Sequence, residues 1–385
     1  MIYPDYCSPA FIQQLMQAHQ PKKNITVKTV EKFSIDNSAS ILAVLTAQRT
    51  TGMVGHAGLQ VAYEEAGVPQ VRRMVLKIKP HGTEIVEMLN SLAQACGGQL
   101  APVYEKYKTK SGFQYTHVRE QEIYGKLSPS FSPEIFGLHT DDQQQVYMIL
   151  MEYLEEVELL NSVMQPALWT NEHITAALQQ LAGWHASMLK TTSTLDLSLW
   201  DDAPSLPYMQ ELTPLWQALL DHAATCFPDL YTTDRVELLQ QAIHHIPDRW
   251  RFLSHLPKTL IHNDCNPRNA CFKQADDKKK FCLYDWELST FHIPQYDVVE
   301  LLCFVLDKDR YSHRAGYIEY YRQELHKHTG QYADAAQFNY ALELAALDFA
   351  LHRVGMYVMA HTVNPYPFLP RVIDSLFDTI SRRPA

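Results

Sequence analysis

The sequence predicts an α+β protein in which a small antiparallel sheet comes first and a larger helical part follows. From Ile25 to Pro80, apolar and polar residues alternate, which is typical of half-buried strands. Beyond Leu160, apolar residues recur mainly at helical spacing. A short apolar run over residues 146–154 ends the first part. We therefore predict a first lobe of residues 1–154 and a helical second lobe of residues 155–385.

The first lobe should open with a helix and continue as strands. Ser8 and Pro9 are typical of a helix start, because a hydroxyl caps the first turn and proline fits within it. Gly97-Gly98 ends a later amphipathic helix. The predicted strands are 25–33, 40–47, 61–67, 72–80 and 146–154, with a Gly-containing connection around Thr51–Gly58, and the two later helices are 83–96 and 117–127.

The second lobe should be almost entirely helical. Its apolar residues follow the period of an amphipathic helix in six segments, and the proline- and serine-containing stretch Thr191–Pro207 interrupts them. The predicted helices are 171–190, 209–224, 234–249, 296–306, 312–328 and 335–361.

Composition excludes several classes of protein. The 385 residues carry a formal charge of −10 and no basic run, which argues against a nucleic-acid-binding surface. No apolar run reaches membrane-spanning length. The seven cysteines are odd in number and none forms a C-x-x-C pair, so neither a disulfide framework nor a zinc site is expected. We expect a cytoplasmic protein with reduced thiols.

One block, LIHNDCNPRNACF followed by FCLYDWE, carries the chemistry. It places His262, Asp264 and Asn269 in one loop and Asp285 after the next apolar run. Phosphoryl transfer needs a carboxylate that orients the attacking hydroxyl and accepts its proton, which we assign to Asp264. Mg²⁺ prefers carboxylate and amide oxygens, so Asn269 and Asp285 are the predicted metal ligands. His262 is predicted to brace the loop.

A polar turn between two elements would produce much of the same loop composition. The surrounding sequence favours the functional interpretation. An apolar Leu260-Ile261 entry, an apolar exit at residues 270–272 and a short charged turn lead to the run Phe281–Tyr284. This order predicts a hairpin that delivers Asp285 next to the loop.

The block resembles the aminoglycoside phosphotransferase and choline kinase-like superfamily, relatives of the protein kinases. HNDCNPRN resembles the H-[GN]-D-x-x-x-x-N loop of that family, and YDWE resembles its metal-binding motif. PQYDVVELL and LAGWHASM resemble two further family segments, which makes Asp297 a predicted structural anchor and places the helix of residues 181–188 under the loop. The resemblance implies a bilobal protein kinase-like fold, with a nucleotide-binding lobe at residues 1–154 and a catalytic and substrate-binding lobe at residues 155–385. It also implies transfer of the γ-phosphate of ATP, with Mg²⁺, to a hydroxyl of a small molecule.

The resemblance further implies a lysine on a strand that contacts the nucleotide phosphates, paired with a glutamate on a helix. In RRMVLKIKP the best match is Lys77. Lys79 remains an alternative, because residues two apart on a strand point the same way. In VREQEIYGKL the match selects Glu120, with Glu122 as the competitor.

The segment MILMEYL resembles the hinge that binds adenine. There the backbone carbonyl of Glu152 and the backbone N–H of Leu154 would hold the base, and Met151 would lie at the back of the pocket. The corresponding phosphate loop, SIDNSASI, contains no glycine, so Ser38 and Ser40 are the candidate phosphate contacts. A plain serine- and asparagine-rich turn would have the same sequence.

The acceptor is the least defined partner. Asp348 and His352, four residues apart, could face it, with Tyr357 less well aligned, and Trp184 and Trp286 could line a cation-binding pocket or lie in the core. An amino-alcohol, an aminoglycoside and a neutral hydroxylated lipid all remain open, and the acidic charge slightly favours a cation. A protein kinase and a non-catalytic nucleotide-binding regulator are the alternative functions. Arg268 and the oligomeric state stay unassigned.

Overall fold

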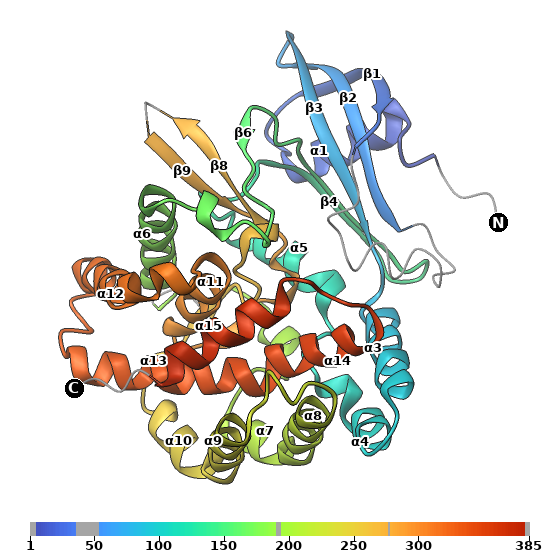
Figure 1. Cartoon of the computed structure of the whole chain (residues 1–385). Helices are drawn as coiled ribbons and strands as arrows, with labels where there is room; N and C mark the ends of the chain where they lie inside the picture. Colours follow the sequence, from blue (N-terminus) through green and yellow to red (C-terminus); the bar gives the residue numbers. More distant parts are fainter. Residues whose placement is uncertain (1–4, 36–53, 190–193, 276–277, 382–385) are drawn as a thin grey trace.

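The first part of the chain is built on a five-stranded antiparallel sheet with the strand order β1-β2-β3-β5-β4 (Figure 1). The computed structural model describes residues 5–35, 54–189, 194–275 and 278–381. The strands are β1 Ile25–Phe33, β2 Gly55–Glu65, β3 Val68–Lys79, β4 Ile135–Asp141 and β5 Val146–Glu152.

The predicted strand 40–47 lies outside the described residues. The predicted loose connection around Thr51–Gly58 is wrong at its end, because β2 already begins at Gly55. A Cβ at Gly58 would lie 2.8 Å from the carbonyl oxygen of Phe33 on the neighbouring strand. This glycine therefore marks close packing within the sheet and not a turn.

Both faces of β5 are buried, which explains its uninterrupted apolar sequence. Met148 and Leu150 point to one face, where they pack in an apolar cluster with Ile12 of α1 Pro9–His19. Ile149 and Met151 point to the opposite face and belong to the main core. Helix α1 begins where predicted, with the Ser8 hydroxyl accepting the backbone N–H of Phe11.

The helices between β3 and β4 lie against the helical part of the molecule. Helix α4 and strand β4 were not predicted. Figure 1 shows α3 beside α14 and α4 beside α8, and the packing contacts agree. Because these helices pack against helices from the second half of the chain, the division into residues 1–154 and 155–385 stays a proposal. The three helices are α3 Gly82–Cys96, α4 Leu100–Tyr107 and α5 Thr116–Lys126.

Two small sheets in the second half carry the loop HNDCNPRN. The predicted hairpin is confirmed, since β8 Ala270–Ala275 pairs with β9 Lys278–Leu283. Strand β6 Val157–Glu158 adds to β8, so the chain reaches this hairpin soon after it leaves the five-stranded sheet. Strands β7 Thr259–Ile261 and β10 Thr290–His292 form a separate pair at the other end of the loop.

The rest of the second half is helical, as predicted, but three predicted helices are divided. Pro214 and Pro247 each lie in the first turn of a new helix, because proline has no N–H to continue the preceding one. A π-helical turn, Ala350–Val354, divides the third. Helix α15 was not predicted. The helices are α6 Asn171–Met188, α7 Leu206–Glu211, α8 Thr213–Cys226, α9 Thr233–His244, α10 Ile246–Ser254, α11 Gln295–Val305, α12 Arg314–Thr329, α13 Ala335–Phe349, α14 Gly355–Val363 and α15 Leu369–Ser381.

The predicted α+β class, with an antiparallel sheet in the N-terminal part and helices in the C-terminal part, is confirmed. Within the described ranges, no helix combines the length and the apolar character needed to cross a membrane.

Candidate active site

The loop between β7 and β8 is held by one buried carboxylate. Asp297, on α11, accepts the backbone N–H groups of His262 and Asn263 at 2.8 and 2.9 Å and contacts Nε2 of His185 at 3.1 Å. Its side chain is fully buried. Burial would raise the pKa of Asp297, but the hydrogen bond and charge of His185 and the backbone N–H groups lower it. Asp297 thus anchors the loop, as its position in PQYDVVELL suggested.

A second set of contacts ties this loop to the chain around Asp285. Nε2 of His262 contacts the carbonyl oxygen of Tyr284 at 3.0 Å, and Nδ2 of Asn263 donates to the carbonyl of Leu288 at 2.9 Å. Asn263 has a positive φ of 59°, a conformation that asparagine tolerates better than most residues. His262 therefore holds the loop in place, and its side chain is not among those that line the cleft.

Asp264 projects from this loop into a ring of hydrogen-bond donors. Its Oδ1 accepts from Nη2 of Arg353 at 2.6 Å, from the hydroxyl of Tyr357 at 2.8 Å and from Nδ2 of Asn266 at 3.0 Å. Its Oδ2 accepts from Nδ2 of Asn269 at 2.7 Å. The Asn269 amide nitrogen is thereby committed to Asp264, which leaves its side-chain oxygen as the atom available to a cation.

These donors keep Asp264 ionised. Burial would raise the pKa of Asp264, but the positive charges of Arg353 and Arg268, together with the Tyr357 hydroxyl, lower it to about 2. A carboxylate in this state can accept a hydrogen bond from a hydroxyl group throughout the neutral pH range.

Asp285 lies at the opposite side of the same cleft. It follows β9 with a left-handed backbone, φ 68°, which turns its side chain towards the sheet. There Oδ1 of Asp285 pairs with Nζ of Lys77 at 2.6 Å. Burial would raise the pKa of Asp285, but the charges of Lys77 and Lys79 lower it. Carboxylate oxygens of Glu120, Asp285 and Glu287 all lie within 4.8 Å of one another.

Two lysines of β3 share one buried glutamate. Oε2 of Glu120 accepts from Nζ of Lys77 at 2.7 Å and from Nζ of Lys79 at 2.5 Å. Lys77 also reaches Asp285, whereas Lys79 reaches Glu287 at 2.8 Å and is only 1% exposed. Glu122, the competitor of Glu120, instead accepts the backbone N–H of Asp196. The geometry therefore favours Lys77 and Glu120 over their alternatives.

A cleft of about 510 Å³ joins these groups to the predicted hinge. Met151, Glu152 and Leu154 line one end, and Lys77 lies with the loop residues further in. Other lining residues are Ile35, His56, Val75, Asp264, Asn269 and Asp285. Ser38 and Ser40 lie outside the described residues, so their predicted role has no structural account.

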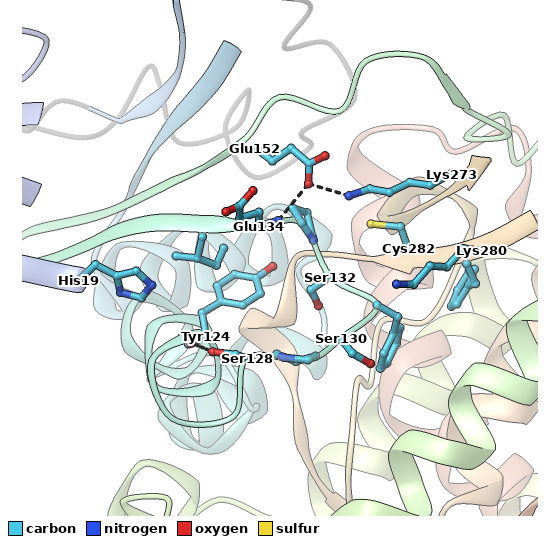
Figure 2. Close-up of a pocket in the computed structure, with 15 residues that line it drawn as sticks. His19, Tyr124, Ser128, Ser130, Ser132, Glu134, Glu152, Lys273, Lys280 and Cys282 are labelled. Carbon is cyan, nitrogen blue, oxygen red and sulfur yellow. Dashed lines mark hydrogen bonds and ion pairs between the residues drawn. The ribbon is translucent and has the colours of Figure 1, made fainter. Parts of the chain in front are cut away.

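A second cavity, of about 440 Å³, also has Glu152 in its lining. Figure 2 shows the residues that surround it. The carboxylate of Glu152 accepts from Nζ of Lys273 at 2.6 Å and from the backbone N–H of Glu134 at 3.0 Å. Glu152 therefore lines both cavities, with its carboxylate engaged by Lys273 and Glu134.

The comparison with protein families decides how this arrangement is classified. A sequence model of the phosphotransferase enzyme family matches residues 65–334, well over half of the chain, including the strand with Lys77 and the whole Asp264–Asp285 block. The chain belongs to the phosphotransferase enzyme family. The resemblance seen in its motifs is thereby confirmed, and so is the predicted protein kinase-like fold.

Solved structures similar to this phosphotransferase are distant. An ethanolamine kinase of Plasmodium vivax is 9% identical, with 91% of this chain and 81% of that chain covered and a TM-score of 0.45. A choline/ethanolamine kinase family protein from Mesorhizobium loti is 11% identical, with 91% and 92% covered and a TM-score of 0.37. No curated protein matches the sequence.

The acceptor side of this phosphotransferase differs from what the sequence suggested. Asp348 is buried and binds Arg249 and His292, so it is a structural residue. Trp184 and Trp286 are buried in the core and do not line the cleft. Two other residues contact Asp264. Tyr357 of α14, which was expected to align less well, donates to it, and Arg353 of the π-helical turn, which the sequence did not single out, forms an ion pair with it. His352 contacts the carbonyl oxygen of Ser111.

The different roles predicted for Lys77 and Lys79 in this phosphotransferase can be distinguished by mutation. Lys77→Met should lower kcat/KM for the nucleotide by about 10²-fold, because it removes the charge that is predicted to contact the phosphates. Lys79→Met should mainly lower the free energy of unfolding, by about 3–5 kcal/mol, because it leaves Glu287 without its lysine partner and Glu120 with Lys77 alone. Steady-state kinetics and urea denaturation of both variants measure the difference. A larger kinetic defect in Lys79→Met would reverse the assignment.

Proposed function

We propose that this protein is an ATP- and Mg²⁺-dependent kinase that transfers the γ-phosphate to a hydroxyl group of a small molecule. The observation that carries the proposal is the gathering of Asp264, Asn269 and Asp285 on one cleft together with the Lys77–Glu120 pair. The cleft thus combines a carboxylate that can receive a proton, oxygen ligands for a cation and a charge for the phosphates.

The residues fit a magnesium ion. Asp285 is ionised, Asn269 offers an amide oxygen, and Mg²⁺ prefers such hard oxygen ligands. When bound, the ion would neutralise charge on the phosphate oxygens. Asp264 orients the acceptor hydroxyl, whose oxygen attacks the γ-phosphorus as the bond to the bridging oxygen of ADP breaks. The hydroxyl proton passes to Asp264.

The remaining contacts to the nucleotide belong to the same proposal. The backbone carbonyl of Glu152 and the backbone N–H of Leu154 would hold adenine against Met151, which lines the cleft with them. Ser38 and Ser40 stay predicted phosphate contacts. The seven free cysteines support a reducing, cytoplasmic location.

A small acceptor fits the cleft better than a peptide. After Asp285 the chain makes one short turn, Trp286–Leu288, and then forms β10, which pairs with β7. Helix α11 begins directly afterwards, at Gln295. This stretch leaves no long segment beside Asp264 on which a peptide could dock.

Metal dependence tests the nucleotide site. ATP at about 100 times its Kd should add about 2.7 kcal/mol to the free energy of unfolding, and the gain should require Mg²⁺. Asp285→Asn should abolish the part of the gain that depends on Mg²⁺, because it removes the charged ligand. Thermal unfolding with and without EDTA measures both. Glu122→Gln is the matched control, since Glu122 lies away from the lysines, and it should retain the full gain.

Turnover tests the proposed reaction itself. A panel of hydroxylated metabolites and antibiotics, assayed for ADP release with Mg-ATP, should contain substrates of the wild-type protein. A protein that binds Mg-ATP but releases no ADP with any member of the panel, and none slowly with water, would instead be a nucleotide-binding regulator.

A further inference from the structure

The cleft beside Asp264 carries two arginines where a cation-binding enzyme would carry acids. Arg268, from the HNDCNPRN loop, and Arg353, from the π-helical turn, both donate to the hydroxyl oxygen of Tyr357, at 3.0 and 3.1 Å. Both arginines line the cleft. Arg268 also lies over the ring of Phe368, 5.4 Å from its centroid, which fixes its guanidinium on the side of the C-terminal helices.

The positive charge at this end exceeds the negative charge. Arg353 forms an ion pair with Asp264, but Arg268 has only the neutral oxygens of Asn266 and Tyr357 as partners and pairs with no carboxylate in the described part of the chain. Arg353 is 5% exposed, and its Nε has no hydrogen-bond partner among the described residues. Arg268 therefore has no carboxylate of its own, because Asp264, whose charge also acts on Arg268, is already paired with Arg353. Two cations that share one carboxylate in a half-buried place cost free energy unless a ligand supplies a second negative charge.

Glu300 is a further acid beside the loop that carries Asp264. It is fully buried, and its Oε2 accepts the backbone N–H of Cys265 at 3.0 Å. Burial and the charge of Asp264 raise the pKa of Glu300 to about 8, so it is mostly protonated at pH 7. It therefore does not supply the missing negative charge.

The wall next to the arginines is apolar. Met88, Leu89 and Leu92 of α3 line the cleft, together with Met356 and Ala360 of α14, the helix that also carries Tyr357. Helices α3 and α14 pack side by side, as Figure 1 shows, so these apolar residues of the cleft come from two neighbouring helices. A ligand that contacts both this surface and the arginines must be amphipathic.

We propose that the acceptor is a hydroxy acid with an apolar tail, whose carboxylate binds Arg268 and Arg353 while its hydroxyl faces Asp264. A single negative charge matches the single excess positive charge, which favours a carboxylate over a phosphate ester. Because Arg353 lies 2.6 Å from Asp264, the carboxylate and the hydroxyl must be only a few bonds apart. The tail lies along the α3–α14 wall. This inference rests on the proposed function.

Three matched probes differ only in the charge near the hydroxyl: 3-hydroxyoctanoate, octane-1,3-diol and 1-aminooctan-3-ol. Their binding is measured by calorimetry in the absence of nucleotide. The acid should bind at least about 10-fold more tightly than the diol, since charge-assisted hydrogen bonds from arginine to a carboxylate contribute on this scale. The amine should bind most weakly. Equal or tighter binding of the amine, or no binding of the acid, would overturn the proposal.

The variant Arg268→Gln tests whether Arg268 itself binds the carboxylate. It should weaken binding of the acid about 10- to 100-fold and leave the diol unchanged. Arg251→Gln is the control, because Arg251 is an exposed arginine on α10. If Arg268→Gln lowers the melting temperature strongly, Arg268→Lys keeps the charge and should retain part of the preference for the acid. An equal loss for all three probes would show a merely structural role.

The two proposals can fail separately. Charge-selective binding of the acid without any ADP release supports the hydroxy-acid site and contradicts the kinase. Mg-dependent ATP turnover with alcohols that carry no acid, and without charge-selective binding, supports the kinase and contradicts the hydroxy-acid site.

Discussion

Replacing Asp264 by asparagine is expected to lower kcat by about 10³-fold while leaving the Kd for Mg-ATP nearly unchanged. An amide has almost the same shape as the carboxylate, but it cannot receive the proton of the attacking hydroxyl, and such proton transfers contribute about 10²- to 10⁴-fold to rates. The nucleotide contacts proposed for Lys77 and Asp285 do not involve Asp264, so binding should survive. Steady-state kinetics together with the thermal shift produced by Mg-ATP measures the two effects.

Asp264 also has a structural partner, so its variant needs a stability control. Asparagine leaves Arg353 without its ion pair, and melting temperatures must be compared before rates are interpreted. Asp229→Asn, at an exposed aspartate in the connection between α8 and α9, should change neither kcat nor the melting temperature. Retention of more than about a tenth of the wild-type kcat in a folded Asp264→Asn protein would contradict the role of proton acceptor.

Removing the anchor of the loop should have the largest effect on stability. Asp297→Ala is expected to lower the free energy of unfolding by about 3–5 kcal/mol, because a buried charged group is deleted and its partners remain. Two backbone N–H groups and His185 lose their acceptor at once. Urea denaturation gives the change in free energy, and kcat should fall with it because the loop then no longer fixes Asp264.

Asp297→Asn separates charge from shape in this experiment. The asparagine oxygen can still accept one or both backbone N–H groups. The Asp297→Asn protein should therefore lose less free energy of unfolding than the Asp297→Ala protein. Asp309→Asn, an exposed position after α11, serves as the matched surface change and should stay within about 0.5 kcal/mol of the wild type. A loss below about 1 kcal/mol for Asp297→Ala would show that the loop is held by other contacts.

The parts of the site that sequence could predict are those encoded over short distances. Asp264, Asn269 and Asp285 lie within one loop and the hairpin that follows it, and the apolar runs on either side predict that hairpin directly. The helix boundaries at Gly97 and around Ser8 follow from local capping in the same way. For these elements the nearest neighbours in sequence are also the neighbours in space.

The acceptor side could not be predicted because its neighbours are remote in sequence. Arg353 and Tyr357 meet Asp264 only after some ninety intervening residues have folded. Regular helical spacing suggested Asp348 and His352 instead, but these two residues line a separate small cavity, and nothing in the sequence marks the π-helical turn that precedes Tyr357. Proline positions, by contrast, were visible in the sequence and would have divided two of the long predicted helices correctly.

The π-helical turn Ala350–Val354 holds one residue more than a regular helical path would. Deleting that residue would rotate everything after it by about 100° around the axis, and would carry Tyr357 away from Asp264. The side chains that face the Asp264 loop from α14 therefore depend on the length of this turn, and a one-residue deletion within it would replace them with others.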